Sequence, residues 1–156
     1  MIAWLIGGWA MAAEPVKATC AVAEVLFECP VKGGKVLQVC GEEGETPWMQ
    51  YVFGKPGAPD LVYPAARMGS VSWFTYEERT FAQSMGQALV FTNNGVRYEL
   101  VEMIGGGAGP MAESNNFAGV YVHKDDKLLA TVACTTPPKS NWERMKTLAL
   151  LAESAF

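Results

Sequence analysis

Short runs of alternating apolar and polar residues, separated by turn residues, make up most of the chain from residue 21 onward. Two of these runs, residues 21–29 and 36–40, flank the pair Gly33 and Gly34. Such runs around a glycine turn are typical of two antiparallel strands. The pattern therefore predicts a β-hairpin near the start of the chain.

The clearest strand pattern is a second pair of runs, residues 88–92 and 96–101, on either side of Asn94 and Gly95. Asn and Gly tolerate the positive φ angles that tight hairpin turns require. Apolar and charged residues alternate in the second run, so one face of this predicted hairpin meets water.

Other strand-like runs cover residues 48–53, 61–63 and 71–76, and the runs 120–123 and 128–134 predict a further hairpin that turns through residues 124–127. Residues 54–60 contain Pro56 and Pro59, and we expect a loop there because proline cannot donate to a strand ladder. The glycine-rich residues 105–116 predict a long surface loop between two hairpins.

The pattern changes after Pro138. Ser140 and Glu143 fit a capping box, and apolar residues then recur at helical spacing at Trp142, Met145, Leu148, Ala149 and Ala152. We expect one C-terminal helix packed across a sheet. The fold class that follows is mainly β: an antiparallel sandwich or small barrel of about seven or eight strands with one C-terminal helix.

The start of the chain is an uncharged apolar segment. The apolar run 2–9 is too short to cross a hydrocarbon core of about 30 Å, and Ala10 and Ala12 form a small-residue cleavage motif. We expect a signal peptide over residues 1–12, a single β-domain over 13–156 and no integral membrane span. A buried N-terminal strand or helix is the alternative.

The four cysteines are Cys20, Cys29, Cys40 and Cys134. An even number behind an export signal predicts two disulfides and a periplasmic or secreted location. Of the three connectivities, we favour Cys29–Cys40 across the first hairpin and Cys20–Cys134 between the ends of the domain. A zinc site is the alternative, but the spacings contain no Cys-x-x-Cys pair.

Composition narrows the classes of function. The chain has 156 residues, 12 basic against 16 acidic side chains, and a formal net charge of −4. It therefore lacks the basic field that nucleic-acid binding requires, and we expect no nucleic-acid partner. With one histidine it cannot form a multi-histidine metal site, and we expect no metal and no cofactor.

Candidate catalytic groups are few. Acidic side chains gather at residues 42–45 and at Glu77 and Glu78, where we expect solvated turns. No Gly-x-Ser-x-Gly motif accompanies His123, which we interpret as an exposed or edge-strand histidine. The chain is therefore expected not to be an enzyme. The alternative is a cell-wall hydrolase that uses Glu77, Glu78 or His123 as acid or base.

Three motifs carry a resemblance to other proteins: Phe-x-Cys at residues 27–29, Lys-x-x-x-x-Cys at 35–40 and Tyr-x-Phe-Gly-x-Pro-Gly at 51–57. With them, the first half of the chain resembles a group of small secreted bacterial β-proteins of unassigned function. The resemblance implies export and β architecture, and no activity. In architecture alone the chain is also similar to bacterial inhibitors of lysozyme.

The functional expectation is an exported, non-enzymatic domain that binds another protein of the cell envelope, as an inhibitor or an immunity protein does. Two loops are expected to make the contact, through Lys55, Asp60, Gly106, Gly107, Met111 and Asn115. A small-molecule carrier that uses a barrel interior is a further alternative. The sequence leaves the oligomeric state open.

Overall fold

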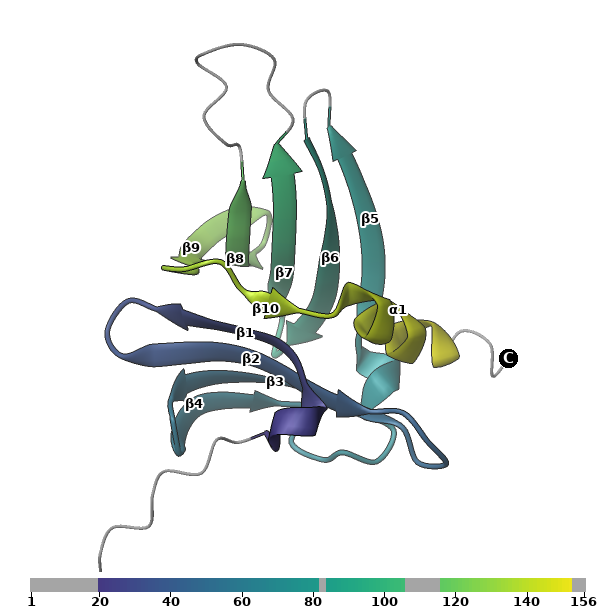
Figure 1. Cartoon of the computed structure of the whole chain (residues 1–156). Helices are drawn as coiled ribbons and strands as arrows, with labels where there is room; N and C mark the ends of the chain where they lie inside the picture. The colour runs from purple at the N-terminus through teal and green to yellow at the C-terminus, as the bar shows by residue number, and fades with distance from the viewer. Residues whose placement is uncertain (1–19, 82–83, 106–115, 153–156) are drawn as a thin grey trace, which may run out of the picture.

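Figure 1 shows a computed structural model of the chain, in which two antiparallel β-sheets pack face to face and a helix lies beside them. The structure describes residues 20–81, 84–105 and 116–152. The predicted signal peptide, residues 1–12, lies outside these ranges. The mainly β class and the sandwich form are confirmed, with ten strands in place of seven or eight and no closed barrel.

The first sheet has the strand order β10-β1-β2-β3-β4. Its strands are β1 (Val25–Val31), β2 (Lys35–Glu42), β3 (Trp48–Lys55), β4 (Ala58–Tyr63) and β10 (Lys139–Ser140). A short 3₁₀ helix, η1 (Val22–Glu24), precedes β1. The predicted first hairpin is confirmed, because β1 pairs with β2 around the turn that contains Gly33 and Gly34.

The second sheet has the strand order β5-β6-β7-β8-β9. Its strands are β5 (Thr75–Phe81), β6 (Ser84–Asn93), β7 (Val96–Gly105), β8 (Phe117–Lys124) and β9 (Lys127–Ala133). The predicted β6–β7 hairpin is confirmed, with a two-residue turn at Asn94 (φ 51°) and Gly95 (φ 76°). Positive φ at both positions is what the Asn-Gly pair indicated.

The predicted loop over residues 54–60 is wrong. Strand β3 runs to Lys55 and β4 begins at Ala58, so only Pro56 and Gly57 form the turn. Pro59 is accommodated because β4 is an edge strand and the ladder shifts register beside it. A proline therefore did not end the sheet here.

The predicted strand over residues 71–76 is also wrong in its first half. Ser70–Trp73 form a 3₁₀ helix, η2, and β5 begins only at Thr75. The Ser70 hydroxyl accepts a hydrogen bond of 2.8 Å from the Met49 backbone N–H, which docks this turn against β3. A tertiary contact has overridden the local alternation.

The C-terminal helix is confirmed as α1 (Trp142–Leu151), but its predicted cap is wrong. Asn141 is the N-cap, and its side chain accepts from the Arg144 N–H at 3.2 Å. Ser140 belongs to β10, and its hydroxyl donates to Glu102 of β7 instead. Pairing with β1 holds Ser140 in the sheet, so the helix begins one residue later than the capping box indicated.

The disulfides are Cys20–Cys40 and Cys29–Cys134, so the favoured pairing is wrong although two bridges are confirmed. In the first hairpin Cys29 lies opposite Leu37, three residues from Cys40. An odd offset puts two side chains on opposite faces of a sheet. Accordingly Cys29 faces the main core, while Cys40 packs with Cys20 on the outer face of the first sheet.

The main core fills the space between the sheets and under the helix. Its fully buried members include Leu26, Phe27, Leu37, Val39, Met49, Leu89, Leu100, Val120, Met145 and Leu148. In Figure 1 the second sheet rises beyond β10 and α1, so one end of β5, β6 and β7 extends past the first sheet. The inner face of this extension is therefore not covered by the first sheet.

Candidate functional site

Three of the four sheet edges carry features that hinder the addition of another strand. Strand β4 contains Pro59 and Asp60, and β10 is two residues long. Strand β5 contains Glu77, Glu78 and Arg79, and α1 packs against it. Prolines, charges, short strands and covering helices are the usual ways in which proteins protect an edge.

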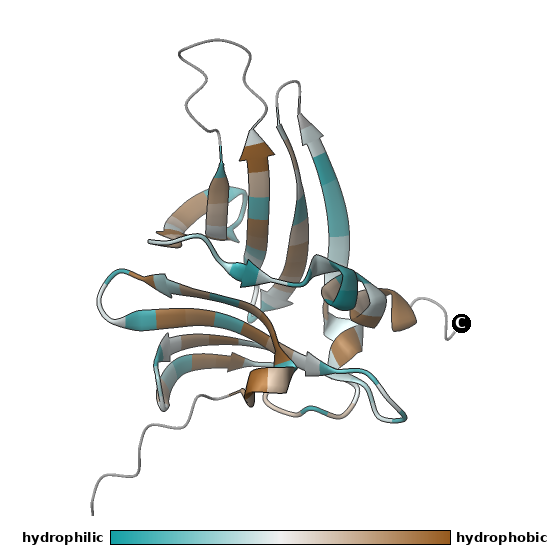
Figure 2. Ribbon diagram, in the orientation of Figure 1, coloured by the Kyte–Doolittle hydropathy of each residue, from teal (hydrophilic) through white to brown (hydrophobic). Residues whose placement is uncertain are grey.

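Strand β9 has none of these protections. After Lys127 its sequence is Leu-Leu-Ala-Thr-Val-Ala, without a charge or a proline. Leu128 is 55% exposed and Leu129 is 56% exposed, and only Val132 in this strand is half-buried. Figure 2 shows the apolar colour along much of β9, at the outer side of its sheet. An exposed apolar edge of this kind is a template for pairing with another chain.

The hydrogen-bond pattern shows which backbone groups of β9 are free to pair. Just past the end of β9, the Cys134 N–H donates to the Ala118 carbonyl of β8 at 2.9 Å. In an antiparallel ladder the bonded positions alternate, so Thr131 and Ala133 direct their N–H and C=O away from β8. These groups form the open side of the edge.

A groove of about 520 Å³ lies beside the last residues of β9. The first sheet contributes Val31, Lys32, Lys35 and Phe53, and the second wall is formed by residues 131–135. The groove is thus bounded by the tip of the β1–β2 hairpin on one side and by the open edge on the other. A strand added to β9 would place every second side chain in it.

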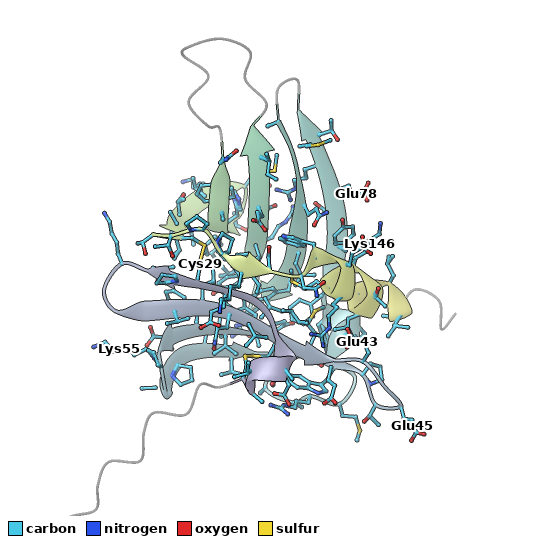
Figure 3. The ribbon with its side chains drawn as sticks, viewed as in Figure 1. Cys29, Glu43, Glu45, Lys55, Glu78 and Lys146 are labelled. Atoms are coloured by element: carbon cyan, nitrogen blue, oxygen red, sulfur yellow. A yellow bond between two sulfur atoms is a disulfide. The ribbon has the colours of Figure 1, made fainter. Side chains whose placement is uncertain are left out.

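The chain after β9 is tied to the first sheet at this groove. Thr135 donates from its N–H to the Pro30 carbonyl at 2.8 Å, and the Cys29–Cys134 disulfide lies beside it. Figure 3 shows the labelled Cys29 at the end of the first sheet near β9. These links hold the groove walls in place, as a preorganised binding site requires.

The structure places the predicted contact residues in two groups. Lys55 and Asp60 lie on the β3–β4 hairpin, and Asp60 pairs with Lys35 at 2.7 Å, on the groove wall. Figure 3 shows Lys55 at the tip of that hairpin, on the same side of the molecule. The other four predicted contacts, Gly106, Gly107, Met111 and Asn115, lie outside the described residues.

The surroundings of this groove are basic although the chain is acidic overall. Lys32 and Lys35 line the groove and no acidic residue does, while Lys55 and Asp60, the partner of Lys35, lie on the neighbouring β3–β4 hairpin. Among the described residues Lys32 and Lys55 have no ion-pair partner. Acidic partners are therefore favoured at the groove beside β9.

Glu77 and His123, the catalytic groups of the hydrolase alternative, meet in an ionic cluster on the outer face of the second sheet. Its centre is Glu99, whose side chain is 11% exposed and contacts Arg79 at 3.2 Å and Arg97 at 2.9 Å. His123 Nε2 lies 3.5 Å from Glu99, and Glu77 pairs with Arg79 at 2.9 Å. The charged groups here neutralise one another.

Glu99, at the centre of this cluster, is held in its charged form. Burial raises the pKa of Glu99, but hydrogen bonding to Arg79 and the charges around it outweigh burial, so that the pKa lies below the ordinary 4.5. Glu78 lies elsewhere, paired with Lys146 of the helix at 3.2 Å. The expected solvated turn is wrong for Glu77 and Glu78, which lie within β5, and this acid pair divides between two separate ion-pair clusters.

No protein-family model, no curated protein and no solved structure matches this chain. The resemblance to small secreted bacterial proteins therefore stays a prediction. Within the described residues no helix is long and apolar enough to span a membrane. The same residues contain no group of three or more His, Cys, Asp or Glu side chains placed to hold a metal.

Sequence reasoning found β9 as a strand but missed it as a contact surface. The run 128–134 is predicted as the second strand of a hairpin, and its lack of charges and prolines is visible in the sequence. What marks Leu128, Leu129 and Thr131 as surface residues is the position of the strand at the end of its sheet. That position depends on the order of all five strands.

Proposed function

We propose that this protein is an exported binding domain that captures an extended segment of another cell-envelope protein as a sixth strand on β9. One observation carries the proposal: among the edges of the described sheets, β9 alone is both long and unprotected. Strand addition is a common mode of peptide recognition, in which backbone hydrogen bonds supply affinity and side-chain pockets supply specificity.

The groove beside β9 supports a partner of particular composition. Its apolar walls, Val31, Phe53 and Val132, suit every second side chain of the added strand. The unpaired Lys32 and Lys55 favour a segment that also carries Asp or Glu. A second copy of this chain is disfavoured, because it would bring the same lysines together.

Export is part of the proposal. The two disulfides fit an oxidising compartment, and the predicted signal peptide over residues 1–12 would direct the chain there. Binding by strand addition suits an inhibitor or immunity role, since it can block the partner without any chemistry of its own.

Thr131→Pro is the variant that tests the proposal. Thr131 directs its N–H away from β8, so proline removes one outward donor and leaves the β8 ladder bonded. Thr131→Ala is the matched control, because it shortens the same side chain and keeps the N–H. Both variants and the wild type serve as bait in an envelope extract, and the captured protein is then purified and titrated directly.

We expect the wild type and Thr131→Ala to bind the purified partner equally and Thr131→Pro to bind at least about tenfold more weakly. Hydrogen exchange must also show the Thr131 and Ala133 amides protected in the complex. Equal binding by all three proteins, or protection elsewhere only, would overturn the proposal. So would a homodimer that the proline variant dissociates, since the occupant would then be a second copy.

A further inference from the structure

A second hollow lies on the inner face of the second sheet, where this sheet extends beyond the first (Figure 1). Its volume is about 540 Å³, and its lining includes Met85, Gln87, Glu102, Ile104 and Trp142. A smaller hollow of about 280 Å³ shares Glu102 and Ile104 with it. We call the larger hollow the Glu102 groove. Its size is within the range of small-molecule sites.

Glu102 is held in this groove by two neutral donors. The Ser140 hydroxyl donates to its Oε1 at 2.6 Å, and the Trp142 indole N–H donates to the same atom at 2.7 Å. Both donors come from the β10–α1 segment, so the carboxylate is fixed against the floor of the groove. Preorganised charge of this kind is typical of recognition sites.

Glu102 carries a charge that no described residue neutralises. Among the described residues no Lys, Arg or His lies within ion-pair distance of it. The other ionic groups along this groove are engaged: Glu78 pairs with Lys146, and Arg79 binds Glu77 and Glu99. A half-buried carboxylate without a cation favours a positively charged ligand.

The neighbouring side chain of Gln87 also has an oxygen that lacks a partner in the described part of the chain. Gln87 lies directly opposite Glu102 in the β6–β7 ladder, and its Oε1 is buried with no hydrogen-bond donor among the described residues. Buried acceptors without a donor are rare in native proteins and call for an explanation. If the Gln87 side-chain amide rotates, one donor that enters the groove next to Glu102 can hydrogen-bond to both Gln87 Oε1 and the Glu102 carboxylate.

The walls of the groove are apolar. Met85 and Ile104 lie opposite each other in the ladder and are 64% and 62% exposed, and Trp142 also lines the groove. Large apolar side chains side by side on a surface are typical of ligand sites. The groove therefore combines apolar side chains with a carboxylate that has no ion-pair partner among the described residues.

We propose that the Glu102 groove binds a small organic cation, an ammonium or guanidinium group carried on an apolar chain. The charged group contacts Glu102 and Gln87, and the chain lies against Met85 and Ile104. This site is distinct from the β9 edge and does not depend on the protein partner proposed above.

The test uses hexylammonium as the probe, with hexanol as its neutral analogue and hexanoate as its anionic one. Binding is followed by the NMR signal of the Trp142 indole N–H, which donates to Glu102. Glu102→Gln keeps an acceptor for Ser140 and Trp142 and removes the charge. Glu45→Gln removes the same charge from an exposed turn that Figure 3 places away from the groove.

We expect hexylammonium to shift this signal saturably in the wild type and in Glu45→Gln, and to bind Glu102→Gln at least about tenfold more weakly. Hexanol should bind all three proteins weakly and alike, and hexanoate should not bind. Ile104→Arg, an exposed substitution that places a cation in the groove, should abolish binding of hexylammonium. The absence of a saturable shift, or equal affinity for Glu102→Gln, would overturn the proposal.

Discussion

At the scale of single residues, Glu99 shows how neighbours change the character of a side chain. Alternation in the β7 sequence indicated that Arg97 and Glu99 meet water, and Arg97 does. Glu99 is instead 9% exposed, because β5 and β8 bring Arg79 and His123 against it. The sequence predicted the face of the strand correctly, but it could not show which strands lie on either side.

The lowered pKa of Glu99 predicts how stability depends on pH. A carboxyl whose folded pKa lies below its unfolded value of about 4.5 stabilises the fold above pH 4.5 and loses this effect as the pH falls through the folded pKa. We expect Glu99→Gln to lower the free energy of unfolding by about 2 kcal/mol at neutral pH, and the difference from wild type to shrink in acid. Urea unfolding at several pH values measures both.

Glu45→Gln is the control for that experiment, since Glu45 is exposed and does not belong to the ionic cluster around Glu99. Its stability should follow the wild type across the whole pH range. A constant difference between wild type and Glu99→Gln from neutral to acid pH would contradict the assigned role of the Glu99 charge.

At the scale of elements, Gly119 determines how closely β9 can lie against β8. It has φ of +154°, and a Cβ at this position would collide with the Val132 carbonyl oxygen. A glycine within a strand often marks such a close approach of another backbone. The glycine is visible in the sequence, but the sequence does not show which strand approaches it.

Gly119→Ala is therefore expected to destabilise the protein by about 2 kcal/mol or more and to loosen β9. Gly44→Ala is the matched control, because Gly44 has a similar φ of +140° but open space around its Cβ position. Only the backbone strain should remain there, about 1 kcal/mol. Thermal unfolding compares the two variants, and equal losses would show that contact with β9 is unimportant.

The edges of the sheets show the same limit of sequence patterns at this scale. Local alternation predicted the β1–β2, β6–β7 and β8–β9 hairpins, because each depends on a turn and on the residues beside it. It could not show that β9 ends a sheet, since that depends on the order of distant strands. The candidate site was therefore predicted only through Lys55 and Asp60, at its rim.

At the scale of the whole molecule, the two disulfides differ in what they join. Cys20–Cys40 joins positions 20 residues apart and links the segment before β1 to β2, whereas Cys29–Cys134 joins positions 105 residues apart and connects the first sheet to the end of β9. In the chain-entropy account the longer closure restricts the unfolded chain more. The second bridge should therefore contribute more to stability.

Removing Cys29–Cys134 with paired alanines is expected to lower the free energy of unfolding by about 5 kcal/mol, and removing Cys20–Cys40 by about 3 kcal/mol. Urea unfolding of the two double variants gives both values under identical conditions. The Cys20–Cys40 variant is the internal control for the loss of buried sulfur. Cys20, Cys29 and Cys40 are 1–2% exposed, so each double variant removes buried sulfur. The reverse order of stability would contradict this account.

The sequence alone determined the strand-rich class, three hairpins, the C-terminal helix and the presence of two disulfides, because short-range periodicity and turn chemistry decide these features. Only the tertiary structure decided the disulfide pairing, the exposed edge at β9 and the surroundings of Glu99 and Glu102. Each of these requires knowing which distant segments lie side by side, and that depends on the register and order of the strands and on the packing of the two sheets and the helix.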